Sequence, residues 1–118
     1  MKPQLRSIDT NSAASLQEIC SQNRERFGFW VNASVGSDET DGSDDFQIFV
    51  CDQAWLDDRN ALGEDVKDKY LLIEGGCDGD RLTDSLNAYL SQCVGNDWAE
   101  VVAKISKIGI WEFEDYQP

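Results

Sequence analysis

The hydrophobic pattern is most regular in two neighbouring segments, Gly28 to Val35 and Asp45 to Cys51, where apolar side chains recur at every second position. Such alternation is typical of strands with one buried face. The connecting residues 36–44 are rich in Gly, Ser and Asp, which favour turns. We therefore predict an antiparallel hairpin with an acidic loop at its tip. Its expected core residues are Phe29, Val31, Phe46, Ile48 and Val50.

Weaker patterns flank the hairpin. Residues 4–8 fit a short strand, and residues 15–21 fit a short helix because their apolar side chains recur at helical spacing. After the hairpin, Asp52 is a candidate N-cap for one or two helical turns that end near Asp58. The short apolar run 70–74 is closed by two glycines and predicts a further strand.

The C-terminal part predicts two amphipathic helices. Apolar residues from Leu82 to Cys93 follow helical spacing, with Asp80 as the expected N-cap. A second apolar stripe begins at Trp98, and we expect Asp97 to cap that helix and Gly109 to end it. The tail, residues 110–116, alternates in polarity and fits an extended segment.

Strands that come first and helices that come last indicate the α+β class. We predict an antiparallel sheet of three or four strands with two C-terminal helices packed on one face. A chain of 118 residues is expected to form one domain, residues 1–118.

Charge restricts the possible partners. The chain has 23 acidic and 10 basic residues and no histidine, for a net charge of −13. Such a surface repels phosphate, so nucleic acids and anionic membranes are disfavoured partners. It suits steering toward a basic protein, although simple solvation also accounts for it. The N-terminus lacks the apolar run of a signal peptide, and no segment approaches ~18 apolar residues, so we expect a cytoplasmic protein.

Catalytic and metal-binding residues are scarce. Without histidine, triads of the Ser–His or Cys–His type and His-ligated metal sites are excluded, and no phosphate-binding glycine motif occurs. The four cysteines form no C-x-x-C pair, and we expect reduced, buried thiols. Neighbouring carboxylates arise by chance among 23 acids. We predict a protein that is not an enzyme and has no cofactor; whether the acidic tip binds a metal ion stays open, since it lacks the calcium-loop pattern.

Several blocks of sequence together resemble a known family. They are Gly28-Phe-Trp-Val31, Phe46-Gln-Ile-Phe-Val-Cys-Asp-Gln-Ala-Trp-Leu56, Leu71-Leu-Ile-Glu74 and Trp111-Glu-Phe-Glu-Asp-Tyr116. In order and spacing they are similar to the immunity protein 8 family of bacterial polymorphic toxin systems, from about Gly28 to Tyr116. The resemblance implies a small cytosolic α+β protein that binds the C-terminal domain of a secreted toxin and blocks it. A nuclease is one kind of toxin whose basic surface would attract this acidic chain.

The candidate partner-binding residues combine acids with aromatic neighbours, as protein interfaces do. They form three groups: the hairpin tip with Asp38, Glu39, Asp41, Asp44 and Asp45; the tail with Glu112, Glu114, Asp115 and Tyr116; and the helical turn with Asp57 and Asp58.

Two other functions remain open from the sequence. An acidic nucleic-acid mimic, or another non-enzymatic interaction module, would explain the charge by imitating spaced phosphates. A small enzyme would need two carboxylates with raised pKa values in one concave pocket.

Overall fold

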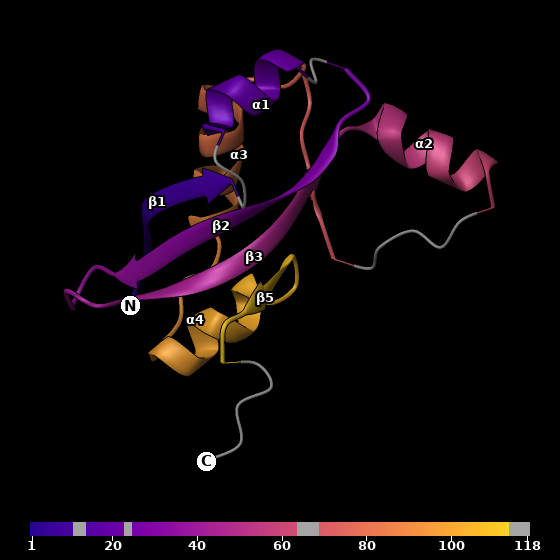
Figure 1. Cartoon of the computed structure of the whole chain (residues 1–118). Helices are drawn as coiled ribbons and strands as arrows, with labels where there is room; N and C mark the ends of the chain where they lie inside the picture. The colour runs from indigo at the N-terminus through magenta and orange to yellow at the C-terminus, as the bar shows by residue number, and fades with distance from the viewer. Residues whose placement is uncertain (11–13, 23–24, 64–68, 114–118) are drawn as a thin grey trace.

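A computed structural model describes residues 1–10, 14–22, 25–63 and 69–113. The elements in chain order are β1 (Pro3–Thr10), α1 (Leu16–Gln22), β2 (Gly28–Ser37), β3 (Ser43–Cys51), α2 (Gln53–Ala61), β4 (Leu71–Leu72), α3 (Gly79–Leu90), α4 (Trp98–Ile105) and β5 (Gly109–Trp111). This arrangement confirms the α+β prediction (Figure 1).

The sheet has five strands among the described residues, rather than the three or four expected. Strands β1, β2 and β3 run antiparallel in sequence order. The far edge of β3 is shared by two short strands: β4 pairs in parallel with its C-terminal end, and β5 pairs antiparallel with its N-terminal half. Strand β4 lies within the predicted run 70–74, whereas β5, at the start of the tail that was expected to be extended, is the additional strand.

The hairpin β2–β3 buries the predicted face. Val31 lies opposite Ile48, and Ala33 lies opposite Phe46. These four side chains are fully buried in the main core. Alternation therefore identified the core face correctly, and the hairpin is the longest element of the molecule, with its tip at the left of Figure 1.

Three helices supply the other side of this core. Their buried residues are Cys20 from α1, Leu82, Leu86 and Leu90 from α3, and Val101, Val102 and Ile105 from α4. Figure 1 shows α3 behind the strands. The prediction of two C-terminal helices packed on one face is confirmed, and α1 joins them there.

The opposite face of the sheet is only partly covered. At the end of the hairpin away from the tip, Phe49, Cys51 and Leu56 form a second small core. Helix α2 supplies Leu56 and Trp55 to this cluster, which Trp30 also joins. The rest of that face carries polar side chains, such as Asn32 hydrogen-bonded to Gln47 at 2.7 Å.

Two of the predicted N-caps are confirmed. The Asp52 carboxylate accepts from the backbone N–H of Trp55 at 2.9 Å, and that of Asp97 accepts from Glu100 at 2.8 Å. The predicted cap Asp80 is wrong: Asp78 is the extended residue whose carboxylate accepts from the N–H groups of Asp80 and Arg81.

Gly109 begins β5 and does not end the preceding helix, which ends at Ile105. A Cβ atom at Gly109 would lie 2.9 Å from Ile48 Cγ1, so glycine here allows β5 to approach β3 closely. Close approach of two backbones is a common reason for glycine in a strand.

The expectation of four reduced thiols is wrong for two of them. Cys20 and Cys77 form a disulfide, with Cα atoms 4.9 Å apart, and lie 57 positions apart in the sequence. Helix α1 packs beside the start of α3, and this long-range contact brings the two cysteines together. Cys51 and Cys93 are free and buried, as predicted.

No helix within the described ranges is both long enough and apolar enough to cross a membrane.

Candidate partner-binding surface

The hairpin tip is shaped by hydrogen bonds to a buried serine. Ser37 is 2% exposed, and its Oγ accepts from the N–H groups of Glu39 and Thr40 at 3.1 and 3.0 Å. Arg6 of β1 donates from Nη2 to the carbonyl oxygens of Ser37 and Thr40 at 2.9 and 3.0 Å. The tip is therefore a defined turn that presents its acidic side chains from a fixed backbone.

Asp38 lies on this turn and faces the N-terminal strand. Its Oδ1 accepts from the backbone N–H of Lys2 at 2.8 Å. This hydrogen bond lowers the pKa of the exposed Asp38 carboxyl from its ordinary value, because it favours the charged form. Asp38 therefore remains ionised at neutral pH.

Glu39 and Asp41 are the outermost acids of the tip. Both are exposed, and neither carboxylate has a hydrogen bond or ion pair with a residue of the described ranges. Their charges are thus available to a partner without the loss of an internal contact.

Asp44 has a different role, because it connects three elements. Its Oδ2 accepts from the indole Nε1 of Trp98 at 2.7 Å and from that of Trp111 at 2.9 Å. The side chain of Asp44 is only partly exposed. One carboxylate oxygen thereby ties α4 and β5 to the base of the hairpin tip.

Asp45 and Glu112 lie side by side on the open face of the sheet. Asp45 accepts from Ser34 Oγ at 2.5 Å, and its backbone N–H donates to Glu112 Oε1 at 3.0 Å. The backbone N–H of Glu112 in turn donates to the Asp45 carbonyl at 3.0 Å. The structure thus brings the predicted tip acids next to Glu112, the first residue of the predicted tail group.

Asp57 and Asp58 do not join them. They lie on α2, beyond the other end of β3, and eight strand residues at ~3.3 Å each separate the two ends by about 26 Å. Asp57 accepts from Gln53 Nε2 at 3.0 Å. Asp58 pairs with Arg26 Nη1 at 2.8 Å, and this pairing raises the pKa of Arg26. The acids of α2 therefore have local partners.

Glu114, Asp115 and Tyr116 lie outside the described residues. The preceding Phe113 is 43% exposed rather than buried, and its ring packs edge-on against Trp111 with centroids 5.3 Å apart.

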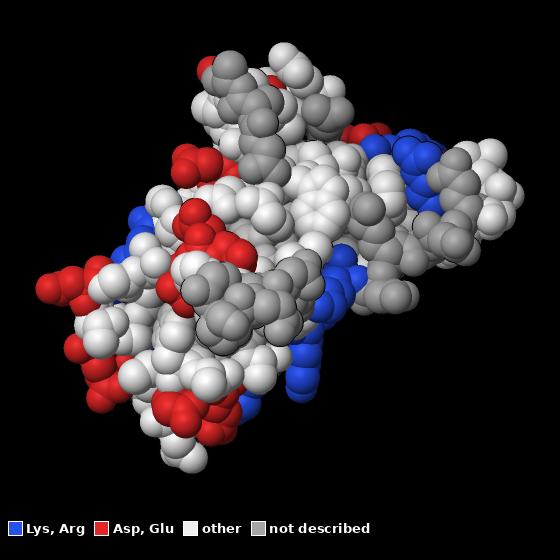
Figure 2. Space-filling view, turned by 60° about the horizontal axis from the view of Figure 1, so that its bottom comes forward, with Lys and Arg blue, Asp and Glu red and all other residues white. Residues whose placement is uncertain are grey.

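On the face shown in Figure 2, acidic and basic side chains of the described residues gather at different ends of the hairpin. Figure 2 shows acidic side chains gathered toward the left, the side that holds the hairpin tip in Figure 1, and a basic group at the right beside α2. On α2, Arg59 lies over the ring of Trp55, 5.1 Å from its centroid. On this face, the acidic side chains of the described residues are therefore concentrated at the tip end.

Sequence reasoning missed a hollow between the tip and α4. It has a volume of about 340 Å³ and a mostly apolar lining from Met1, Ser37, Thr40, Gly42, Ser43, Asp44 and Trp98. Met1 lies about 40 positions from the tip residues, and these lie about 55 positions from Trp98. No local sequence pattern therefore predicts the hollow. One sequence feature could have indicated the hollow: Trp98 occupies the first position of a helix whose N-cap was predictable.

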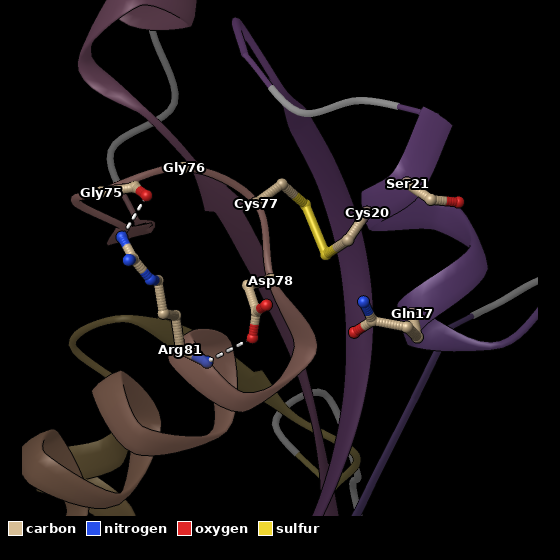
Figure 3. A pocket seen from close by; sticks show the side chains of 8 residues that line it. All are labelled: Gln17, Cys20, Ser21, Gly75, Gly76, Cys77, Asp78 and Arg81. Atoms are coloured by element: carbon tan, nitrogen blue, oxygen red, sulfur yellow. Dashed lines mark hydrogen bonds between the residues drawn. A yellow bond between two sulfur atoms is a disulfide. The ribbon is translucent and has the colours of Figure 1, made fainter.

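A second hollow, of about 330 Å³, lies beside the disulfide (Figure 3). Its polar groups are engaged in holding the fold. Arg81 donates to the Gly75 carbonyl, Gln17 Oε1 accepts from the Gly79 N–H at 3.1 Å, and Asp78 caps α3. Figure 3 shows the Cys20–Cys77 bond forming one wall between α1 and the loop before α3.

The cysteines offer no activated nucleophile. Burial raises the pKa of the Cys51 thiol to about 11, and Cys77 is in the disulfide. Within the described ranges, no three His, Cys, Asp or Glu side chains converge in a way that would hold a metal ion.

Comparison with known protein families gives one clear result. The family model described as Immunity protein 8 matches residues 3–116, nearly the whole chain. Comparison with curated proteins and with solved structures finds no match. The match confirms the resemblance seen in the separate blocks and extends it through the N-terminal strand, and immunity proteins act by binding and inhibiting a cognate toxin. The chain belongs to the immunity protein 8 family.

Proposed function

We propose that this protein neutralises a cognate secreted bacterial toxin by binding the toxin's C-terminal domain through the acidic end of its single domain. The protein acts in the cytoplasm as an inhibitor and not as an enzyme. The family membership supports inhibition of a toxin. The single observation that supports this particular surface is the exposure of Glu39 and Asp41 on a fixed turn, without partners among the described residues.

The charge of the molecule supports a basic partner. A net charge of −13 accelerates encounter with a basic surface, with association rates that reach about 10⁸ M⁻¹s⁻¹ at low salt. Nucleases have such a surface because they bind phosphate, so we propose a nuclease as the toxin. Screening limits the attraction to ~8 Å at physiological salt, which leaves the lifetime of the complex to direct contacts.

Co-expression tests the proposal. Cells that produce the toxin domain encoded beside this gene should grow normally when they also produce this protein. The matched control is the Ile48→Asp variant, which places a charge in the fully buried core and should leave the cells unprotected. Killing that continues in the presence of the folded wild-type protein would refute the proposed function.

A further inference from the structure

The hollow between the hairpin tip and α4 has room for one side chain. Its volume of about 340 Å³ lies at the small end of ligand pockets, which cover roughly 300–1,000 Å³. It is too small for a strand or helix of a partner. The lining is mostly apolar, and Trp98 supplies an aromatic surface within it.

The polar group of this hollow is one oxygen of Asp44. Oδ2 is occupied by the two indole N–H groups of Trp98 and Trp111. Oδ1 accepts no hydrogen bond from the described residues. Every buried side-chain oxygen of those residues has a hydrogen-bond partner, so an oxygen without one is not buried. Oδ1 is therefore solvent-accessible, and it is held in place because the carboxylate is fixed through Oδ2.

The charges around the hollow favour a cation. The exposed acids nearest in sequence to its lining are Asp38, Glu39, Asp41 and Asp97. The cations on the same side are the Met1 ammonium, Lys2 and Arg6. The Met1 ammonium donates to the Gly95 carbonyl at 2.8 Å, and Arg6 donates to two carbonyls of the tip. The Met1 ammonium and Lys2 also act on the Asp38 carboxylate. With Asp44 included, five carboxylates face these three cations, which leaves a local net charge of −2.

We propose that this hollow receives an arginine side chain of the cognate toxin, with the guanidinium against Trp98 and paired with Asp44 Oδ1. The inference rests on the proposed function and names the contact that anchors the complex. Arginine fits better than lysine because its planar guanidinium both stacks on an indole and donates in a fixed fork to a carboxylate. Arginine and tryptophan are also the residues that most often dominate binding energy at interfaces.

The test compares two substitutions that remove the same charge. Asp44→Asn keeps an oxygen for the indole N–H groups but removes the negative charge inside the hollow. Asp57→Asn removes one exposed charge from α2, at the other end of the hairpin. We expect Asp44→Asn to raise the Kd for the toxin domain about 30-fold, as loss of a hot-spot contact does, and Asp57→Asn to raise it less than about threefold.

A second variant blocks the hollow without touching Asp44. A Cβ atom at Gly42 meets no atom within 4 Å, so Gly42→Phe adds a side chain at the rim without straining the turn. We expect at least about tenfold faster dissociation of the toxin domain. The control is Asn60→Phe, on the exposed surface of α2, which should leave dissociation unchanged.

The outcomes separate this inference from the proposed function. If the wild-type protein binds the toxin domain and both Asp44→Asn and Gly42→Phe bind with unchanged Kd, the arginine site is wrong while the inhibitory function stands. If the wild-type protein does not bind the toxin domain, the proposed function itself fails. The matching toxin variants, with single exposed arginines changed to lysine, should include one that reproduces the loss seen with Asp44→Asn; the absence of any such variant would contradict the assignment of arginine.

Discussion

Both ends of the hairpin carry acidic and aromatic residues, but those at the α2 end make internal contacts that those at the tip largely lack. At the α2 end, Asp58 pairs with Arg26, and the aromatic rings of Trp30, Phe49 and Trp55 pack on one another with centroids 5.0–5.3 Å apart. At the tip end, Glu39 and Asp41 have no partners among the described residues.

The aromatic residues differ in the same way. The Trp98 ring at the tip end lines an open hollow, whereas the rings at the α2 end fill a small core. Residues of the same types therefore pack and pair with one another at the α2 end, whereas at the tip they leave carboxylates and a ring surface open to a partner protein. An acid or an aromatic residue therefore marks a binding site only where no internal contact already engages its polar group or ring face.

The largest effect on the molecule as a whole should come from the disulfide, which lies apart from both ends. Replacing Cys20 and Cys77 by serine should lower the free energy of unfolding by about 2–4 kcal/mol, because the bond closes a loop of 57 residues in the unfolded chain. Urea denaturation of the oxidised protein and the double variant measures the difference. If the comparison between the two ends is right, toxin association should change by less than about twofold; a large change would show that the surface depends on α1.

Asp44 should give the next largest effect, because its carboxylate ties both α4 and β5 to the base of the hairpin tip. Asp44→Ala leaves the indole N–H groups of Trp98 and Trp111 without their acceptor and should cost about 2–3 kcal/mol of unfolding free energy. Asp41→Ala, which removes no internal contact, should stay within about 0.5 kcal/mol of the wild type. Equal destabilisation by the two variants in urea denaturation would contradict the distinction drawn here between anchoring and outward acids.

Asp52 tests the claim that acids at the α2 end are structural. Its carboxylate caps α2 through Trp55 N and also accepts from the Arg26 N–H at 2.7 Å. Asp52→Ala should lower the free energy of unfolding by about 1–2 kcal/mol, as loss of an N-cap does. The same protein should associate with the toxin nearly as fast as the wild type. A variant of unchanged stability would remove Asp52 from the structural group.

The smallest effect concerns the pH dependence of Asp38. The backbone N–H of Lys2 lowers the pKa of this carboxyl from the ordinary 3.8. A depressed pKa means that the stabilisation is fully present above the unfolded value and is lost as the pH falls through the folded value. Carboxyl chemical shifts followed by NMR from pH 6 to 2 should show Asp38 titrating below its ordinary value. A midpoint at or above 3.8 would show that the contact to Lys2 is absent in solution.

Local patterns were sufficient to predict the elements and part of the site. Alternation predicted the hairpin and its buried face, the helical stripe from Leu82 predicted α3, and the N-caps Asp52 and Asp97 followed from their position before apolar turns. Each of these depends on neighbours within a few residues. The exposed tip acids were predictable for the same reason, because a turn rich in Gly, Ser and Asp lies at the surface.

Long-range contacts account for what the sequence did not predict. Asp44 meets Trp98 across 54 positions, and Cys20 meets Cys77 across 57. Neither pair has a local signature, since each depends on how helices pack against the sheet. The contact with Trp98 removed Asp44 from the group of simple outward acids, and the ~26 Å length of β3 separates the tip from α2, which carries Asp57 and Asp58.

Toxin association of two variants with the same change of charge tests whether the toxin binds at the acidic tip. Glu39→Lys with Asp41→Lys reverses two acids at the tip, and Asp57→Lys with Asp58→Lys reverses two on α2; all four side chains are exposed, so both proteins should fold. At about 10 mM salt, where the Debye length is ~30 Å, we expect the tip variant to associate at least tenfold more slowly than the wild type, with a weaker dependence on salt. The α2 variant should be slowed less than about threefold. Equal slowing of the two variants, or greater slowing of the α2 variant, would contradict the assignment of the acidic tip as the toxin-binding surface.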